Sequence, residues 1–560
     1  MIQKSEKKQE NRNASIVLGV TIFIMGGCGL AYEYTFSKIS SDVLGNSTQQ
    51  WAIIIGVMMF FMGIGSDLQK RFNDDGLADK LVFVEVLLGL LGGFGALIML
   101  YTYGHSPENF AIIQYGLIGS VGMIIGFEIP LIARINQAYT KDLGINLGSI
   151  LKMDYIGSLC GALLWIFFLP RYFTLIESAF VLGIATLITA AFTAFYFRSL
   201  IHATFKLWIF IISGLIALIL GYTQAKDWTL FAEQYLYADR IILSETTKFQ
   251  HIILTESSRG EVFCYINGHL QFNSFTEHIY HENLVHPAMA IAPRRNKVLI
   301  LGGGDGLAMR EVLKYKDVEE VTLVDIDPEM TRLAKENQYF APLNEYSLSD
   351  SRVKYVENGA LVEGEVEDIY EVDQSDRFVR TTGKTATVTV LNIDAVNYVE
   401  QVPGYFDVII LDFPDPNSPE LAKLYSERFY QHMKGKLNPQ GIFVQQSTSP
   451  YHAKETFLCI GRTIEKSGLV AVPYHDNVPA FGEWGWWIGG RDDFYQRDAI
   501  SDKMEAIDRI FVKTRYITPA LIKASTEWGK DVLATTYNDT TTISSPKAFE
   551  YYLDAWKSAM

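Results

Sequence analysis

Apolar residues are distributed unevenly along this chain. Before about residue 223 they form seven long runs, and after it they occur in short stretches separated by charged residues. The runs lie at roughly 15–36, 51–65, 81–103, 110–134, 150–170, 173–197 and 206–223. Because a helix needs about 20 mostly apolar residues to cross a bilayer, they predict a multi-pass α-helical membrane bundle over 15–223, preceded by a polar tail at 1–14. The first run is too long for a cleaved signal peptide.

Small residues recur inside the runs and predict a compact bundle in place of a lone anchor. Glycines give faces on which two helices can approach each other closely. They are Gly26, Gly27, Gly92, Gly93, Gly157 and Gly161.

Acidic residues lie inside the runs or at their edges, at Glu33, Glu85, Glu128, Asp154 and Glu177. One interpretation is a cation path or cation-binding site within the membrane. The other is hydrogen bonding between helices, or a position at the membrane interface. We favour the second interpretation, most strongly for Glu85 and Glu177.

The basic residues of the loops raise a problem of topology. Lys and Arg gather in the N-terminal tail and in every second loop after it, so the positive-inside rule puts the N-terminus in the cytoplasm. Seven crossings would then put the second half of the chain outside the cell. The chemistry derived below requires a cytoplasmic second half, which we expect. The N-terminus would then lie outside, one run would not cross fully, or an eighth crossing would exist.

The second half begins with the pattern of a small β-domain. Short apolar stretches alternate between 241 and 275, and Asn267-Gly268 is a strong signal for a hairpin turn. A helix is expected to start near Thr276. We therefore predict a linker and a small antiparallel β-domain over 224–290.

A larger α/β domain is predicted over 291–495. Helices between most of its strands favour a parallel, doubly wound sheet of the Rossmann-like, methyltransferase type. The strands are expected at 297–301, 320–325, 387–392, 406–411, 441–445, 468–474 and 485–489.

Two segments depart from the alternation of strands and helices. The acidic stretch 357–384 is expected to be a solvated, inserted hairpin, and the alternative is a collar that attracts polycations. The tail at 496–560 is expected to be a mainly helical extension without chemistry of its own.

Composition excludes some functions. Hydrophobic residues make up 49% of the chain, and the net charge of −15 argues against a nucleic-acid partner. The cysteines have no metal-ligand spacing and suggest no disulfide framework, so we predict no metal site. They are Cys28, Cys160, Cys264 and Cys459.

The chemistry begins at a glycine turn. Residues 297–306 read Lys-Val-Leu-Ile-Leu-Gly-Gly-Gly-Asp-Gly, an apolar strand followed by a turn in which Gly302 and Gly304 let the backbone approach a ligand. Asp325 ends the next strand, where an acid can accept hydrogen bonds from both ribose hydroxyls. Asp394 follows a third strand and could contact the adenine amino group. The pattern predicts a site for an adenosyl compound.

Asp305, inside the glycine turn, indicates which adenosyl compound is bound. Leu307 occupies the last position of the dinucleotide pattern G-x-G-x-x-G, which weakens an NAD prediction. Many methyltransferases carry an acid before their glycines, where this chain is apolar. A carboxylate at 305 would repel the carboxylate of S-adenosylmethionine and attract the ammonium group of its decarboxylated form.

A pair of acids follows the fourth strand. Asp412 and Asp415 stand at its carboxyl end, around Phe413-Pro414, where open α/β sheets bind ligands. Two carboxylates so close together are costly unless cations neutralise them. The alternative is a simple turn in which Asp415 caps a helix.

These residues stand in ordered blocks that resemble the spermidine synthase family of polyamine aminopropyltransferases over roughly 240–495. With the apolar runs ahead of it, the chain is similar to the long, membrane-bound bacterial branch. The blocks are Thr247-Lys-Phe-Gln-His-Ile252, Asn267-Gly-His-Leu-Gln271, Tyr280-His281-Glu282, Gly302-Gly-Gly-Asp-Gly306, Asp325-Ile-Asp327, Asp412-Phe-Pro-Asp-Pro416, Tyr425-Ser-Glu-Arg-Phe-Tyr430 and Gln446-Ser-Thr-Ser-Pro450.

The resemblance implies an enzyme that uses decarboxylated S-adenosylmethionine as co-substrate and has no prosthetic group. Gln271, Asp325 and Asp394 would hold this nucleotide, and Asp305 and Asp412 would bind its ammonium group.

The resemblance also implies an acceptor amine, with putrescine expected. Spermidine and methylthioadenosine would then form by in-line displacement. Asp415 and Tyr280 would orient the amine and help to remove its proton. The expected acceptor channel is lined by Gln250, Glu277, His281 and Tyr474. A homodimer and a location in the cell membrane are expected as well.

The chain departs from the family pattern at the acceptor side. Phe413-Pro414 stands where the family usually has Ser or Thr, Thr276 replaces a frequent acid, and Asn267 replaces an Asp. A membrane polyamine transporter or sensor with a binding-only domain is therefore a second hypothesis. A membrane-bound methyltransferase is a third, which Asp305 disfavours. The intact acids favour the enzyme.

Overall fold

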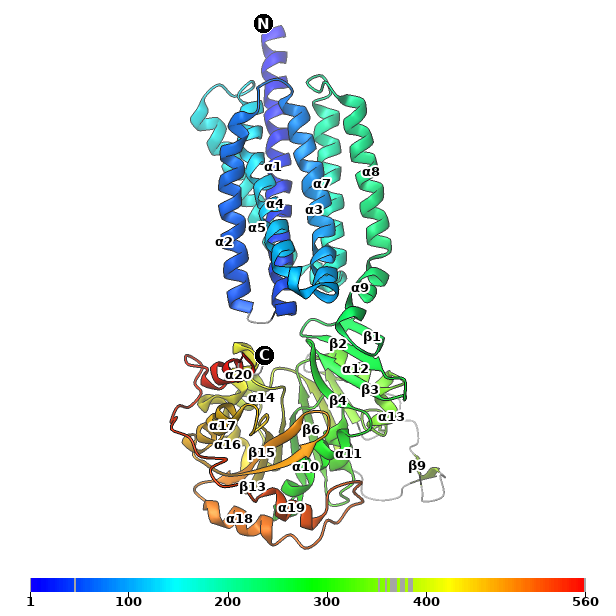
Figure 1. The fold of residues 1–560 in the computed structure, drawn as a ribbon, viewed down its shortest axis with the longest axis vertical. Helices are drawn as coiled ribbons and strands as arrows, with labels where there is room; N and C mark the ends of the chain where they lie inside the picture. The colour runs from blue at the N-terminus through cyan, green and yellow to red at the C-terminus, as the bar shows by residue number, and fades with distance from the viewer. Residues whose placement is uncertain are drawn as a thin grey trace. The chain divides into compact units, whose positions relative to one another are not determined.

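The computed structural model describes residues 2–44, 47–350, 353–357, 360–362, 370–372, 378–380 and 386–557. The chain divides into two compact units, Met1–Lys248 and Phe249–Met560 (Figure 1).

The first unit is a helical bundle. Among the described residues, seven helices are long and apolar enough to cross a membrane, and they coincide one by one with the seven apolar runs of the sequence. They are α1 (Ile2–Leu44), α2 (Ser47–Leu68), α3 (Leu77–His105), α4 (Pro107–Asn136), α5 (Leu143–Phe167), α7 (Leu175–Tyr196) and α8 (Thr204–Thr223), and the short helices α6 (Leu169–Tyr172) and α9 (Ala225–Glu233) flank them.

Glycines set the distance between α1 and α5, as predicted. A Cβ atom on Gly157 would lie 1.9 Å from the carbonyl oxygen of Phe23, and one on Gly161 would lie 2.2 Å from that of Gly27. Only a residue without a side chain fits at such a backbone contact. At these two glycines the helices therefore pack backbone against backbone.

The acids of the bundle differ in their surroundings. Glu177 forms a capping box with Thr174 at the start of α7, which agrees with a structural role. Glu85 and Glu128 are almost completely buried. Both carboxyl oxygens of Glu85 and one of Glu128 lack a hydrogen-bond partner within the described residues. The interhelical hydrogen bonds expected for Glu85 are thus not formed by this part of the chain.

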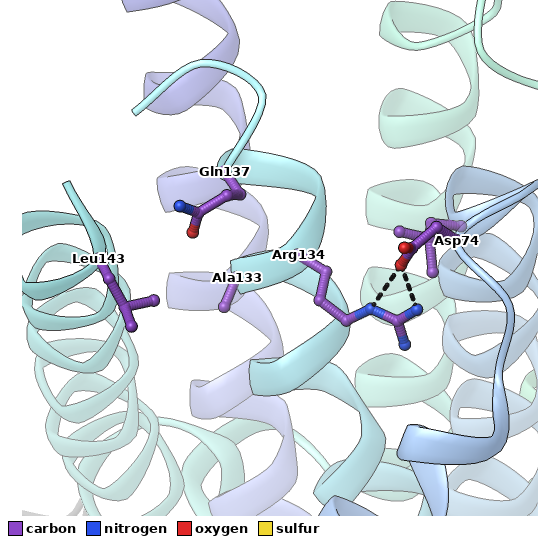
Figure 2. A pocket seen from close by; sticks show the side chains of 6 residues that line it. Asp74, Ala133, Arg134, Gln137 and Leu143 are labelled. Carbon is purple, nitrogen blue, oxygen red and sulfur yellow. Dashed lines mark hydrogen bonds and ion pairs between the residues drawn. The ribbon is translucent and has the colours of Figure 1, made fainter. Parts of the chain in front are cut away.

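A pocket of about 330 Å³ lies at one end of the bundle (Figure 2). Arg134 of α4 forms an ion pair with Asp74 at its edge. Its guanidinium also donates to the side chain of Gln69 (2.9 Å) and to the carbonyl of Phe72 (2.8 Å). Arg134 therefore ties the loop between α2 and α3 to α4. The lining residues are Asp74, Leu77, Ala133, Arg134, Gln137 and Leu143.

A small antiparallel sheet precedes the α/β domain, as expected. The described strands follow the order β1-β2-β3-β4. Asn267 and Gly268 join β3 to β4 with φ values of 49° and 81°, the left-handed conformation that a two-residue hairpin requires. Helix α10 (Glu277–Ile291) begins one residue after Thr276. The strands are β1 (Arg240–Thr246), β2 (His251–Glu256), β3 (Val262–Ile266) and β4 (His269–Asn273).

The described residues of the α/β domain form a nine-stranded sheet of order β14-β15-β13-β12-β5-β6-β11-β7-β8. The central strands β5, β6 and β12 are buried on both faces, which explains their unbroken apolar sequences. The strands are β5 (Lys297–Gly302), β6 (Glu320–Asp325), β7 (Val353–Glu357), β8 (Ala360–Val362), β11 (Thr387–Asn392), β12 (Phe406–Asp412), β13 (Leu437–Gln446), β14 (Leu469–Val478) and β15 (Gly482–Arg491).

The expectation of a wholly parallel sheet is wrong at both edges. Strands β7, β11, β6, β5, β12 and β13 are parallel to their neighbours in this series. By contrast, β15 runs antiparallel to β13 and β14, and β8 antiparallel to β7. The reason is the connection: three residues join β14 to β15, whereas a parallel pair needs a long crossover.

Helices cover the two faces of this sheet and fix the loops at its edge. Helix α12 shows how the sequence starts them, because Asp327 accepts from the backbone N–H of Glu329 and Pro328 takes the first helical position. The helices are α11 (Leu307–Leu313), α12 (Pro328–Glu336), α13 (Phe340–Leu343), α14 (Ala395–Gln401), α15 (Pro419–Ala422), α16 (Glu427–Lys436) and α17 (Lys454–Lys466).

The tail after 495 is less helical than predicted. It contains α18 (Arg497–Glu505), α19 (Pro519–Ser525) and α20 (Lys547–Lys557), separated by long irregular segments. Pro519 and Pro546 and a run of Thr, Asn, Asp and Ser between them favour turns over helix. The irregular segments are nevertheless fixed. Glu282 of α10 accepts three backbone N–H groups, from Arg515, Tyr516 and Ile517, at 2.6–2.8 Å.

The acidic insertion is described only in part. Within 357–384, β9 (Tyr370–Val372) and β10 (Phe378–Arg380) form an antiparallel pair. Glu371 lies in β9. The remaining acids of the stretch lie outside the described residues, at Glu363, Glu365, Glu367, Asp368, Asp373 and Asp376. The solvated hairpin and the polycation collar therefore both stay predictions.

The close contact of α1 and α5 can be tested with two alanines on the same helix. Gly157→Ala adds a methyl group against the carbonyl of Phe23, and we expect it to lower the apparent unfolding temperature in detergent by roughly 5 °C. Gly148→Ala is the control, because a Cβ there meets nothing within 4 Å and alanine favours helix. Equal unfolding temperatures for the two variants would contradict backbone packing of these helices.

Candidate active site

The glycine turn and the acids meet at the carboxyl edge of the parallel strands. Gly302 at the end of β5 pairs with Asp412 at the end of β12. A Cβ at 302 would lie 2.2 Å from the carbonyl oxygen of Asp412, and the φ of Gly302 is 84°. The position therefore requires glycine, both for its conformation and for space.

Asp325 closes the other side of the turn. Its two carboxylate oxygens accept from the backbone N–H of Gly304 (2.9 Å) and of Asp327 (2.8 Å). Burial raises the pKa of Asp325 to about 6, and these two hydrogen bonds oppose the rise. Each oxygen keeps a lone pair, so the carboxylate can still accept from a pair of hydroxyls.

Asp305, Asp412 and His281 form a tight cluster. The three side chains offer atoms that lie within 4.8 Å of one another. Asp412 also accepts from the hydroxyl of Tyr280 (2.7 Å), and Asp305 accepts from the backbone N–H of Leu307 (2.9 Å). Burial raises the pKa of both carboxyls.

His281 carries a positive charge in this cluster. Its Nδ1 lies 2.9 Å from the Glu277 carboxylate, which Arg310 also holds at 2.8 and 3.0 Å. Burial alone would lower the pKa of His281, but the hydrogen bond and charge of Glu277 raise it to about 9. A protonated imidazole is a poor metal ligand, since metals bind the neutral ring. With both carboxyls ionised and His281 protonated, the cluster would have one net negative charge, which would suit one ammonium group.

Asp415 lies in a separate set of hydrogen bonds. One carboxylate oxygen accepts from Thr448 (3.1 Å), and the other from Gln446 (3.4 Å). Tyr552 of α20 is a further hydrogen-bond partner. Burial raises the pKa of Asp415 to about 6, and the three hydrogen bonds oppose the rise. A half-buried carboxylate of this kind can accept a proton at physiological pH.

The turn between Asp412 and Asp415 is fixed by hydrogen bonds from side chains outside the turn. The hydroxyl of Tyr425 donates to the carbonyl oxygen of Pro414 (2.7 Å), and Gln446 donates to that of Phe413. Asp415 does not cap a helix in the described residues, because Ser418 caps α15. The simple-turn interpretation therefore does not explain this acid.

Other predicted residues lie further from the cluster or have partners already. The Glu277 carboxylate contacts His281 and Arg310, and its place in the acceptor channel stays a prediction. Tyr474 donates to the carbonyl oxygen of Asn283 (2.8 Å) and stacks on Trp486, which in turn contacts Tyr280. Tyr474 thus packs against Tyr280 through Trp486.

The predicted adenine and ribose contacts are spread over two sheets. Asp394 caps α14 and forms an ion pair with Lys423 at 2.6 Å. Gln271 lies on β4 and donates to the carbonyl oxygen of His269 (3.1 Å), and Gln250 directly precedes β2. The contacts of Gln271 and Asp394 with the nucleotide, and of Gln250 with the acceptor amine, stay predictions.

Sequence reasoning gave no role to four residues of the site. Arg310 could have been noticed as an Arg-Glu pair in an otherwise apolar helix after the glycine turn. Gln446 and Thr448 belong to one of the ordered blocks of the family, but no neighbouring residue in the sequence indicates that they contact Asp415. Tyr552 is 137 positions away from Asp415 in sequence and no motif marks it.

Comparison with known proteins identifies this arrangement. The family model described as the spermine/spermidine synthase domain matches residues 277–377 and 372–493. A polyamine aminopropyltransferase of Leptospira interrogans is 37% identical over 477 residues, which cover 85% of this chain and 87% of the relative. The chain belongs to the spermine/spermidine synthase family. It is an aminopropyltransferase.

The similarity to aminopropyltransferases extends through the helical unit. The relative from Oceanobacillus iheyensis, also a polyamine aminopropyltransferase, is 33% identical and covers 96% of each chain. A crystal structure of a spermidine synthase in complex with the transition-state analogue AdoDATO is 23% identical and covers 52% of this chain and 88% of its own, with a TM-score of 0.41. The family resemblance, including its long form, is thus confirmed.

Proposed function

We propose that this aminopropyltransferase moves the aminopropyl group of decarboxylated S-adenosylmethionine to a diamine, with putrescine as the expected acceptor. The observation that carries the proposal is the cluster of Asp305, Asp412 and His281, whose side-chain atoms lie within 4.8 Å of one another. The two carboxyl groups there would attract an ammonium group. S-adenosylmethionine itself would bring a carboxylate to the same acids.

The nucleotide would lie along the carboxyl edge of the sheet. Asp325, with Gln271 and Asp394, would hold the ribose and the adenine. The glycine turn from Gly302 would lie beside the sulfonium group, because it joins the strand ends that carry Asp412 and Asp325. The donor would thus be held at both ends, which fixes the carbon next to sulfur.

The acceptor amine would approach between Asp415 and Tyr280. Its nitrogen lone pair attacks the aminopropyl carbon bound to sulfur, a C–N bond forms, and the C–S bond breaks with its electron pair moving to sulfur. Methylthioadenosine leaves as a neutral thioether. At neutral pH the acceptor amine is protonated and has no free lone pair, so before the attack it gives a proton to Asp415, whose pKa is raised to about 6.

Product analysis tests this proposal directly. The detergent-purified protein would receive decarboxylated S-adenosylmethionine and a panel of diamines and polyamines, followed by mass spectrometry. We expect methylthioadenosine together with one aminopropylated amine, and spermidine when putrescine is the acceptor. Asp415→Asn should bind the nucleotide normally and turn over at least about 100-fold more slowly. Nucleotide binding without any product across the panel would sink the proposal.

The role of Asp305 can be tested by ligand preference. Asp305→Asn removes the negative charge near the ammonium group. We expect the preference for the decarboxylated nucleotide over S-adenosylmethionine to fall by at least about tenfold, measured as dissociation constants by calorimetry. Asp502→Asn is the control, because Asp502 lies exposed on α18. An unchanged ratio in Asp305→Asn would refute this account of the glycine turn.

We further propose that the helical unit is embedded in the cell membrane and that the enzyme domain is cytoplasmic, because its nucleotide is made in the cytosol. The N-terminus and α9 lie at opposite ends of the bundle (Figure 1), which favours an outside N-terminus over a run that does not cross. This orientation opposes the basic residues of the loops.

Cysteine labelling tests the orientation. In a background without Cys160, a membrane-impermeant maleimide should label Gln9→Cys in intact cells. It should label Lys530→Cys, which is exposed in the second unit, only after lysis. The reverse pattern would place the enzyme domain outside and remove the proposed topology.

A further inference from the structure

The C-terminal helix α20 is anchored firmly beside the proposed acceptor site. Its approach is fixed at Thr541, which is completely buried. The carbonyl of Thr541 accepts from the backbone N–H of Glu427 (2.9 Å), and its hydroxyl accepts from that of Ala548 (2.9 Å). Ala548 belongs to the core cluster of the α/β domain. The tail is therefore part of the folded enzyme domain.

Helix α20 also contacts both loops that hold Asp415. It packs against α15, which begins four residues after Asp415, and against α17, which follows the loop of Thr448. The ring of Trp556 stacks on His452 of that second loop, with 6.3 Å between the ring centres. The helix thus contacts both the segment that follows Asp415 and the segment that follows Thr448, its hydrogen-bond donor.

Tyr552 extends from this helix to the acid itself. Its side chain is 7% exposed, and its hydroxyl hydrogen-bonds Asp415. Trp556 is a second hydrogen-bond partner of that hydroxyl. Burial, the charge of Asp415 and the hydrogen bond to it raise the pKa of Tyr552, so the phenol stays protonated and remains a donor.

We propose that α20 completes the acceptor side of the site and that Tyr552 is a positioning residue, which holds the Asp415 carboxylate in the orientation that receives the proton of the acceptor amine. The inference rests on the proposed function, because it assigns the base role to Asp415. Two oxygens offer about four lone pairs. Thr448, Gln446 and Tyr552 occupy three of them and leave one direction for the amine.

The groups around Asp415 affect how its titration appears in the pH dependence of activity. Asp415 acts on three phenols: through its charge on Tyr280 of α10 and on Tyr425 before α16, and through a hydrogen bond on Tyr552 of α20. Burial raises the pKa of each of them. Asp412 is the charged neighbour on the same turn. Near pH 6 the phenols stay neutral. Burial raises the pKa of Asp412 to about 6 as well, and His452 lies beside Trp556 of α20, so the test compares the acid limbs of matched variants.

Tyr552→Phe tests the proposal by removing one hydroxyl. Its hydrogen bond lowers the pKa of Asp415, so its loss should raise that pKa. Asp415 must be ionised to act as a base, and activity is lost as the pH falls through its pKa. The acid limb of kcat/KM for the amine should therefore move to higher pH, by about one unit. The KM for the nucleotide should stay unchanged.

Tyr551→Phe is the matched control on the same helix, because the hydroxyl of Tyr551 donates to Asp539 and not to Asp415. Its acid limb should coincide with that of the unchanged protein. Trp556→Phe is a second variant at a more exposed position, and the loss of its N–H should move the acid limb in the same direction as Tyr552→Phe. Binding of methylthioadenosine, measured by calorimetry, checks that each variant is folded.

Two results would overturn the proposal: an acid limb in Tyr552→Phe that coincides with that of the unchanged protein, or an equal shift in Tyr551→Phe. Both comparisons need an active parent protein. A failure of the proposed function is therefore distinct, because it would appear as absent product in the unchanged protein before any variant is made.

Discussion

Negative charge is concentrated at the carboxyl edge of the sheet, where Asp305, Asp325, Asp412 and Asp415 follow three neighbouring parallel strands. Carboxylates so close together repel one another, and burial adds to the cost of ionising them. The protein offsets this cost only in part. Backbone N–H groups serve Asp305 and Asp325, and His281 adds one positive charge. Arg310 forms ion pairs with Glu277 and Glu311 instead of with these four acids. A cationic ligand therefore completes the electrostatics of the edge.

The same edge explains how much the sequence could predict. A central parallel strand is buried on both faces, so β12 appears as a nearly continuous apolar run. The bounds predicted for β6 and β11, 320–325 and 387–392, agree with the structure. Glycines at 302 and 304 and the acid at 325 are local signals, because the turn needs them for its own backbone. Residues that act through distant contacts gave no such signal. The antiparallel β15, the irregular tail and the partners of Asp415 depend on packing between segments far apart in sequence.

The helical unit is governed by a different constraint. In a bilayer, apolar side chains gain little by leaving lipid for one another, so close backbone contact holds helices together. Gly157 and Gly161 provide that contact for α1 and α5. Their spacing was visible in the sequence, but their partner helix was not. Glu85 and Glu128 show the opposite case. A carboxyl group in an apolar run is easily noticed, but whether it has a partner depends on three-dimensional packing. Within the described residues, both oxygens of Glu85 and one of Glu128 have no hydrogen-bond partner.

The turn between Asp412 and Asp415 links the departure of this chain from its family to its C-terminal extension. Phe413 and Pro414 carry no hydroxyl and Pro414 has no N–H, so the turn itself can offer Asp415 little hydrogen bonding. The donors come instead from Gln446 and Thr448 on one side and from Tyr552 on the other. An unsatisfied buried charge is costly. Asp415 has few hydrogen-bond donors close to it in sequence, so it needs donors from distant parts of the chain. The tail helix therefore compensates for the stiff, apolar turn, and the two features are parts of one arrangement.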